Sequence, residues 1–365
     1  MRLVSLKAEH YRNIAFAELT PGRALTVICG NNGQGKTNLL EAIWLLTGGK
    51  SFRGGRDAEL IERGQPFAVL EAVTCRDDGT ESSVRLTVGA AESEKPGRRV
   101  KVNGVDRGRA AALAGSFPAV VFDPGHLSLV KGSPEGRRRF LDAALCQLYP
   151  GYLTFYRRYV RAMTQKNALL KNYAETRGAA DILSALNTEL AARGEELQQR
   201  RIAYLSMLTP FAVANYESLS HGAEAMSLAY EYHFEPGALA RKLAAGRENE
   251  LRAGMCLYGP HREDLNILLD GQSARTYASQ GQQRSTVLSL KLAEAACVRE
   301  VTGEAPVMLL DDVLSELDES RKAFLLTCME DKQTFVTSCD DAAFLKTDGE
   351  IYHMEAGVLR RAARG

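Results

Sequence analysis

Two segments far apart in the chain carry residues suited to phosphate chemistry. The first, GNNGQGKT, matches the phosphate-loop pattern G-x-x-x-x-G-K-[ST]. Backbone N–H groups of such a loop face nucleotide phosphates, Lys36 reaches the β- and γ-phosphates, and Thr37 can ligate Mg²⁺. An apolar run precedes the loop and KTNLLEAIWLLTGG follows it, which favours a strand–loop–helix over an accidental glycine turn. The predicted nucleotide-binding residues are Gly30, Asn31, Asn32, Gly33, Gln34, Gly35, Lys36, Thr37 and Asn38.

The second segment, VMLLDDV, places Asp311 and Asp312 directly after four apolar residues. A buried parallel strand that ends at the ligand edge of a sheet has this pattern. We expect Asp311 to hold Mg²⁺ and Asp312 to orient or deprotonate the attacking water. Two neighbouring carboxylates at a buried strand end repel one another without a cation. An acidic cap for the following helix would explain one aspartate but not both.

A third polar segment, YASQGQQRST, has no apolar period and comes directly before a helical run. That helix leads into the Asp311 strand, so it runs antiparallel to it and begins at the phosphate-loop edge of the sheet. Free N–H groups at a helix N-terminus attract anions. Ser279, Gly281 and Gln282 are therefore predicted to form a second phosphate-binding group, with an ordinary polar helix entry as the alternative.

The elements that would position these residues occur at both ends of the chain. ALTVIC, FAVLEAVTC, SSVRLTV and a hairpin that turns at Asn103-Gly104 predict an N-terminal third of strands. Apolar residues at helical spacing from Leu141 to about Ser220 predict an antiparallel helical hairpin with arms of roughly 30–40 Å. The end returns to helix, strand (VMLL), helix and strand (TFVTS). One α/β nucleotide domain interrupted by a helical insertion fits this order.

Composition restricts the classes of protein that fit. The 365 residues allow about two domains. No segment approaches the roughly 18 apolar residues of a membrane span, and seven scattered cysteines without a Cys-x-x-Cys favour a reducing cytoplasm. The net charge of +1 conceals a basic zone, because residues 98–171 hold 14 Lys/Arg against 4 Asp/Glu. That zone fits a polyanion partner, but charge alone does not distinguish nucleic acid from a membrane surface or an acidic protein.

The combination of motifs resembles a known family. The phosphate loop, SQGQQ, LLDD and SELD, in this order, resemble the ABC-type ATPase heads of the SMC and Rad50 class. Within that class, FDPGHLSLVKGSPEGRRRFLD, LYGPHREDL, ASQGQQRSTVLSLKLAE and LKAEHYRNIAFAEL resemble the RecF family of bacterial DNA-repair ATPases. The resemblance covers essentially the whole chain. It implies an ABC-type P-loop ATPase head of residues 1–135 and 250–365 and a helical lobe of residues 136–249.

The resemblance also implies activity and partners. It implies an ATP- and Mg²⁺-dependent homodimer in the cytoplasm, in which Ser279 of one subunit closes on the ATP held by the other. It further implies binding to duplex DNA near single-strand gaps and promotion of RecA loading with RecO and RecR. Arg12 and Asn13 match a turn that lies near the nucleotide, and Gln65 is a weaker prediction for the magnesium side. Asp312 stands where many ABC ATPases carry Glu and is one methylene shorter, so slow hydrolysis is expected. The resemblance further implies that DNA stimulates this weak ATPase activity.

The basic zone then supplies predicted DNA contacts. Ser133 and Pro134 fit the N-cap and first residue of a helix, and the arginines after them cannot all share one face, so one or two are expected to pair internally. Nothing resembles a base-reading motif, which predicts recognition of backbone and shape. The predicted DNA-binding residues are Arg137, Arg138, Arg157, Arg158, Arg161 and Lys166.

Two other functions compete with this interpretation. An ABC-like ATPase switch acting on a protein or membrane complex, without DNA contact, would share the phosphate chemistry but would need a partner that receives its motion. A P-loop kinase would leave the SQGQQR segment without a role. DNA binding that depends on ATP and salt separates the first alternative from the DNA-repair function.

Overall fold

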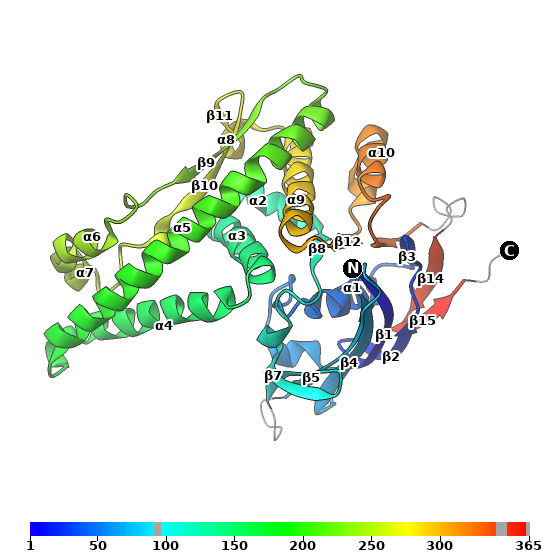
Figure 1. Ribbon diagram of the computed structural model, residues 1–365, viewed down its shortest axis with the longest axis horizontal. Helices are drawn as coiled ribbons and strands as arrows, with labels where there is room; N and C mark the ends of the chain where they lie inside the picture. The colour runs from blue at the N-terminus through cyan, green and yellow to red at the C-terminus, as the bar shows by residue number, and fades with distance from the viewer. Residues whose placement is uncertain (91–95, 341–348, 363–365) are drawn as a thin grey trace. The chain divides into compact units, whose positions relative to one another are not determined.

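The computed structural model describes residues 1–90, 96–340 and 349–362. The chain folds into two compact units: unit 1 holds Met1–His126 and Leu288–Gly365, and unit 2 holds Leu127–Val287. The discontinuous first unit carries both sheets of the α/β part, and the second is mostly helical (Figure 1). The boundaries of these two units differ from the domain limits proposed from the sequence, which placed the head at residues 1–135 and 250–365. Residues 250–287 fall in unit 2, where β10 (Asp264–Leu269) pairs with β9 (Met226–Glu231).

The sheet that carries the predicted chemistry has the order β15-β14-β3-β13-β12-β8. Its strands are β3 (Leu25–Cys29), β8 (Ala119–Phe122), β12 (Val307–Asp311), β13 (Thr334–Ser338), β14 (Glu350–Glu355) and β15 (Val358–Arg361). All neighbours pair in parallel except β14 and β15. β12 is buried at every residue, as expected of a parallel strand covered on both faces. Because β3, β13 and β12 are adjacent, the residues that follow them meet at one edge.

Helices and a second sheet complete unit 1. The helices are α1 (Lys36–Leu45), α10 (Glu319–Thr327) and the part of α9 (Gln280–Thr302) that follows Val287. The second sheet is antiparallel, in the order β2-β1-β4-β5-β6-β7. Its strands are β1 (Arg2–Tyr11), β2 (Ile14–Leu19), β4 (Phe67–Cys75), β5 (Glu81–Gly89), β6 (Gly97–Val102) and β7 (Val105–Arg109). The main core contains Leu40 and Ile43 of α1 together with buried residues of both sheets, such as Leu86 and Leu309.

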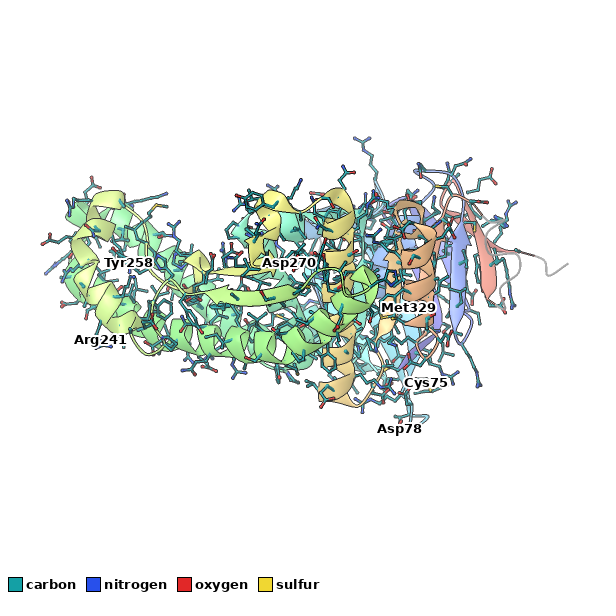
Figure 2. All side chains as sticks on the ribbon, turned by 90° about the horizontal axis from the view of Figure 1, so that it is seen from above. Cys75, Asp78, Arg241, Tyr258, Asp270 and Met329 are labelled. Carbon is teal, nitrogen blue, oxygen red and sulfur yellow. The ribbon has the colours of Figure 1, made fainter. Side chains whose placement is uncertain are left out.

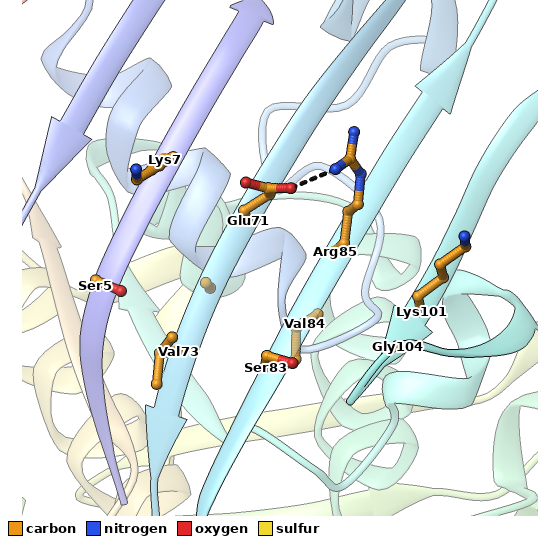
Figure 3. Close-up of a pocket in the computed structure, with 10 residues that line it drawn as sticks. Ser5, Lys7, Glu71, Val73, Ser83, Val84, Arg85, Lys101 and Gly104 are labelled. Atoms are coloured by element: carbon orange, nitrogen blue, oxygen red, sulfur yellow. Dashed lines mark hydrogen bonds and ion pairs between the residues drawn. The ribbon is translucent and has the colours of Figure 1, made fainter.

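The solvent face of the antiparallel sheet is charged. Lys7 lies opposite Glu71, Glu71 opposite Arg85, and Arg85 opposite Lys101. These four side chains line a shallow depression of about 340 Å³, in which Glu71 and Arg85 form an ion pair of 2.5 Å (Figure 3). The predicted hairpin turn is present, because Val102 pairs with Val105 and the turn residues Asn103 and Gly104 both have positive φ.

Unit 2 contains the predicted helical hairpin. α4 (Tyr152–Lys171) packs along α5 (Ala179–Ser220), which continues through Pro210. At 1.5 Å per residue α5 spans about 63 Å, so this arm is longer than predicted. The remaining helices are α2 (Ser128–Lys131), α3 (Pro134–Leu148), α6 (Leu239–Ala245), α7 (Arg247–Ala253) and α8 (Ala274–Tyr277).

The sequence analysis missed a small antiparallel sheet in unit 2, which has the order β11-β10-β9 with β11 at Gln272–Ser273. Side chains in Figure 2 place Tyr258 and Arg241 at the α6 end of this unit and Asp270 just beyond β10. Short 3₁₀ turns lie at Asp57–Leu60, Ala110–Leu113, Pro124–Leu127, Tyr173–Glu175, Pro260–Arg262 and Leu314–Glu316. None of the helices described is long and apolar enough to cross a membrane.

Candidate nucleotide-binding site

The phosphate loop joins β3 to α1 in the predicted strand–loop–helix context. Gly30 and Gly35 have backbone φ angles of 147° and 113°, which residues other than glycine rarely adopt. A Cβ on Gly30 would lie 2.3 Å from the Met354 carbonyl oxygen. Lys36 is buried, and its Nζ donates to the carbonyl oxygens of Gly30 and Asn31 at 2.5 and 3.0 Å. The Lys36 ammonium is therefore held by the phosphate loop itself. To bind a phosphate, it would have to leave these two carbonyl oxygens.

Arg12 and Asn13 brace this loop from the antiparallel sheet. Asn13 Nδ2 donates to the Gln34 carbonyl oxygen at 3.2 Å, and Asn38 Nδ2 donates to Asn13 Oδ1 at 2.7 Å. Arg12 forms a two-point ion pair with the fully buried Glu41 of α1. Although burial alone would raise the pKa of Glu41, hydrogen bonds from Arg12, Ser51 and Tyr11 lower it below its usual value. Arg12 is thus anchored to α1, and Asn13 is the residue of this turn that contacts the loop.

The carboxylate at the end of β12 is joined directly to the loop helix. Thr37 Oγ1 donates to Asp311 Oδ1 at 2.9 Å, and the buried Thr337 donates to the same oxygen at 2.9 Å. Burial raises the pKa of Asp311, and the two hydroxyl donors lower it. A hydroxyl and a carboxylate oxygen side by side are ligands that Mg²⁺ prefers when nucleotide phosphates supply others. These residues therefore fit a magnesium ion bound together with a nucleotide.

Asp312 has a strained backbone. Its φ of 52° lies in the left-handed region, which costs a non-glycine residue of order 1–3 kcal/mol when neighbours impose it. The Asp312 N–H donates to Thr337 Oγ1 at 2.9 Å, and Ser315 Oγ donates to the Asp312 carbonyl oxygen at 2.8 Å. Ser315 Oγ also lies 3.2 Å from Asp312 Oδ1, and the Asp312 carboxylate is close enough to Asp311 to raise the pKa of that residue.

Arg53, Thr337 and Cys339 were missed by the sequence analysis. Arg53 is exposed, donates to Asn38 Oδ1 at 2.5 Å, and lies near enough to Asp311 to lower its pKa. Cys339 follows β13, with Sγ 3.5 Å from Lys36 Nζ and 3.1 Å from Asn32 Oδ1. Thr337 and Cys339 could have been found from their position at the end of β13, which lies between β3 and β12. A single arginine in a loop, such as Arg53, gives no comparable indication.

Gln65, the weaker magnesium-side prediction, lies in an exposed turn where its N–H donates to the Glu62 carbonyl oxygen at 3.0 Å. No hydrogen bond joins its side chain to Thr37 or Asp311 in the described part of the chain. The geometry adds no support for Gln65 as a ligand.

In unit 2, the SQGQ segment forms the first turn of α9, which begins at Gln280, inside the segment that was predicted to precede the helix. The Ser279 N–H donates to Gln282 Oε1 at 2.6 Å, and the Gln282 N–H donates to Ser279 Oγ at 3.3 Å. This reciprocal pair is a capping box. Ser279 is exposed and Gly281 half-buried, so the helix start is open to an anion while its cap is formed.

Two predicted DNA contacts require correction. Arg137 is 3% exposed, and its guanidinium pairs with both oxygens of Asp264, at 2.7 and 2.6 Å. Lys166 is 0% exposed and pairs with the equally buried Glu250 at 2.6 Å. Both side chains are occupied inside unit 2, as was expected for some of the arginines but not for Lys166. Arg138 is only partly available to a DNA partner, because its side chain is half-buried and donates to the Glu263 carbonyl oxygen at 2.6 Å.

Replacement of Arg137 by Ala should destabilise the protein by about 2–4 kcal/mol, because it leaves the Asp264 carboxylate, whose side chain is 14% exposed, without its ion-pair partner. Denaturant unfolding is the measurement. Arg157→Ala, on the exposed face of α4, should change the free energy of unfolding by no more than about 0.5 kcal/mol. Equal stability of the two variants would contradict an internal role for Arg137.

Arg157, Arg158 and Arg161 are exposed along α4. Two aromatic side chains of the same helix make contacts within the unit. Tyr159 is buried and its hydroxyl contacts His261 Nδ1 at 2.7 Å, whereas Phe155 lies under the guanidinium groups of Arg193 and Arg200, at 5.7 and 5.8 Å. Tyr159 and Phe155 are thus used within unit 2, and the exposed arginines present charge to a partner.

The parallel sheet, the phosphate loop after β3, Asp311 at the end of β12 and the inserted helical unit define the class of ABC-type P-loop ATPase heads. The family model described as RecF/RecN/SMC N terminal domain matches residues 2–358. The chain is 38% identical to the DNA replication and repair protein RecF of Heliobacterium modesticaldum, over 99% of this chain and 100% of that protein. It is 37% identical to RecF of Geobacter metallireducens, over 99% and 98%. The chain therefore belongs to the RecF family.

Solved structures agree with this assignment. The recombination mediator protein RecF, in its ATPrS form from the RecFOR pathway, is similar with a TM-score of 0.91 at 30% identity, over 99% of this chain and 98% of that chain. The ATP form of RecF gives a TM-score of 0.90. An Smc head bound to a domain of ScpA, at 16% identity and a TM-score of 0.59, shares the fold. The predicted fold class is confirmed.

Proposed function

We propose that this chain is an ATP-dependent DNA-binding protein of recombinational repair. Binding of ATP closes a dimer of two copies around duplex DNA near single-strand gaps, and slow ATP hydrolysis opens the dimer and releases the DNA. The observation that carries the proposal is the hydrogen bond of 2.9 Å between Thr37 Oγ1 and Asp311 Oδ1. It joins the phosphate loop to the acidic strand end in a chain of the RecF family, whose curated members carry the name DNA replication and repair protein.

ATP is bound by the backbone of the phosphate loop and the N-terminus of α1. Lys36 leaves the carbonyl oxygens of Gly30 and Asn31 and binds the β- and γ-phosphates. Thr37 and Asp311 would hold Mg²⁺, which neutralises the charge that develops on the transferred phosphoryl group. Asp312 orients the attacking water. Its reach is one methylene shorter than that of a glutamate, which favours slow turnover.

The second phosphate-binding group acts between subunits. Ser279, Gly281 and the free N–H groups at the start of α9 bind the γ-phosphate of the nucleotide held by the partner. The capping box leaves the remaining first-turn N–H groups of α9 without helix partners, as at any helix N-terminus. ATP thus contributes to the dimer interface, and its loss opens the dimer. By the family relation, the closed dimer acts with RecO and RecR to promote RecA loading.

The exposed arginines of α4 supply phosphate contacts to DNA. Charge reversal of Arg157, Arg158 and Arg161 together should weaken binding to all sequences alike. It should also reduce the slope of log affinity against log salt by about three, because each lost phosphate contact releases one counterion fewer. Fluorescence anisotropy with gapped duplexes over a salt series measures the slope.

The matched control reverses Arg99, Lys101 and Arg109 on the β6–β7 hairpin, which are also exposed. An unchanged slope in the α4 variant together with a reduced slope in the hairpin variant would move the DNA surface to unit 1. Unchanged slopes in both would favour the ATPase switch that acts without DNA contact.

The direct test of the proposed function is sedimentation with ADP, with ATP, and with ATP plus gapped DNA. We expect a monomer with ADP, a dimer with ATP, and a dimer that sediments with DNA only when ATP is present. A monomer under all three conditions would contradict the ATP-driven closure.

A further inference from the structure

A second group of ionisable side chains lies in unit 1, beside the acidic edge of the parallel sheet. β8 and β12 are parallel neighbours with Phe122 opposite Leu310, so Asp123 and Asp311 follow at the same edge. The Asp123 side chain is 19% exposed. It accepts a hydrogen bond from the Gly125 N–H at 2.7 Å, and the Asp123 N–H donates to His126 Nδ1 at 3.0 Å.

The cation of this group comes from the part of α9 that belongs to unit 1. Lys291 and Glu294 form an ion pair one turn apart, and each side chain is only 3% exposed. Burial raises the pKa of Glu294, and Lys291 opposes that rise. Burial and the Lys291 ammonium lower the pKa of His126. His126 Nδ1 accepts from the Asp123 N–H and also lies 3.2 Å from Asp123 Oδ2, so the imidazole is packed against Asp123.

Asp123 is the link between Lys291 and the metal-side carboxylate. Burial raises the pKa of Asp123, Lys291 lowers it, and Asp311 raises it. The Lys291 ammonium thus acts on the carboxylates of both Asp123 and Glu294, and Asp123 lies beside Asp311 at the edge of the sheet. Asp312 and the exposed Arg53 face Asp311 in addition.

Asp123 does not complete a protein-only metal site. Among the described residues, no group of three or more His, Cys, Asp or Glu could hold a metal ion. Any contribution from Asp123 is therefore electrostatic and acts on a cation that the nucleotide helps to hold. A buried ion pair such as Lys291–Glu294 is weak evidence for stability, so the need for a stable fold does not by itself account for it.

We propose that Asp123 is a positioning residue of the magnesium side of the phosphate site, and that the buried Lys291–Glu294 pair sets the strength of its effect. Asp123 adds negative potential at the metal position without ligating the ion, and Lys291 partly cancels that potential. The buried Lys291–Glu294 pair thereby sets the concentration of metal ion that nucleotide binding requires. The inference rests on the proposed Mg²⁺–ATP site and adds to it a determinant of its metal requirement.

The test is a Mg²⁺ titration of the binding of a fluorescent ATP analogue to the full chain, repeated with Mn²⁺. Asp123→Asn removes a negative charge and should raise the metal midpoint about tenfold. Lys291→Met should lower the midpoint by a similar factor, and Glu294→Gln should raise it. The double variant Lys291→Met with Glu294→Gln restores the charge balance and should return the midpoint to that of the natural chain. A purely structural role would not produce shifts of opposite sign that cancel.

Nucleotide binding in excess EDTA is measured for every variant, which separates a direct effect of the altered charge on the phosphates from its effect on the metal ion. An Asp123→Asn midpoint equal to that of the natural chain would overturn the inference while leaving the nucleotide site intact. If Lys291→Met does not fold, Asp123→Asn and Glu294→Gln decide the matter, and both midpoints must rise. Absence of metal-dependent binding in the natural chain would instead remove the proposed function itself.

Discussion

Replacement of Asp312 by Asn is expected to reduce ATP hydrolysis by roughly 10²–10³-fold while ATP binding is retained. The change removes the charge that orients water but leaves Asp311, Thr37 and Lys36 in place. Asn tolerates the left-handed region, so the φ of 52° at this position should persist. Because hydrolysis opens the proposed dimer, the variant should accumulate as a closed dimer with ATP. Single-turnover hydrolysis and light scattering measure the two effects.

Asp318→Asn is the matched control, because it makes the same chemical change six residues along. Asp318 is the N-cap of α10 and accepts from the Arg321 N–H, a role that Asn also fills. It should hydrolyse ATP at the natural rate. If Asp312→Asn hydrolysed ATP at the rate of the natural chain, Asp312 would be a structural residue at the end of the strand and not a residue that orients water.

Replacement of Lys36 by Met should lower ATP-dependent activity by roughly 10²–10³-fold, because it removes an ammonium that the structure holds at the phosphate loop. The long apolar stem of Met keeps the packing of the buried stem of Lys36. ATP-dependent DNA binding should be lost with it. Nucleotide titration and anisotropy with gapped DNA measure the two losses.

Lys50→Met is the control for the Lys36 variant, since Lys50 is exposed beyond the end of α1 and should leave both properties unchanged. If Lys36→Met binds DNA in response to ATP as the natural chain does, the phosphate loop is not the site of the nucleotide that controls DNA binding.

The nucleotide side could be predicted because its determinants are local. The glycines at Gly30 and Gly35, the helix start at Lys36 and the apolar run before Asp311 can all be identified from neighbouring residues. The start of α9 was predicted too late in the chain, although Ser279 and Gln282 have the spacing of a capping box. The alternation of Leu265, Ile267 and Leu269 likewise indicates β10, although it was missed.

The fate of the basic residues could not be predicted, because it depends on distant partners. Arg137 pairs with Asp264, 127 residues further along the chain, and Lys166 pairs with Glu250. Neither partner is adjacent in sequence or at a helical spacing. Charge density alone therefore overstated the exposed basic surface of residues 98–171, because Arg137 and Lys166 are buried in ion pairs.

The cooperation of two copies is the central claim, and mixing two inactive variants tests it most directly. In the proposed dimer, Lys36 of one copy and Ser279 of the other serve the same ATP. Homodimers of Lys36→Met, or of Ser279→Arg, have two defective sites. A mixed dimer has one doubly defective site and one intact site. Random pairing yields about half mixed dimers, so an equimolar mixture should recover roughly a quarter of the natural sites.

DNA-stimulated ATPase activity of the equimolar mixture is the measurement, and subunit exchange is confirmed by mass or fluorescence. The account predicts recovery of about one quarter of the natural activity, because one of four sites in a random population is intact. No recovery despite confirmed exchange would contradict it, and Ser279 would then act within its own subunit or serve only as the cap of α9.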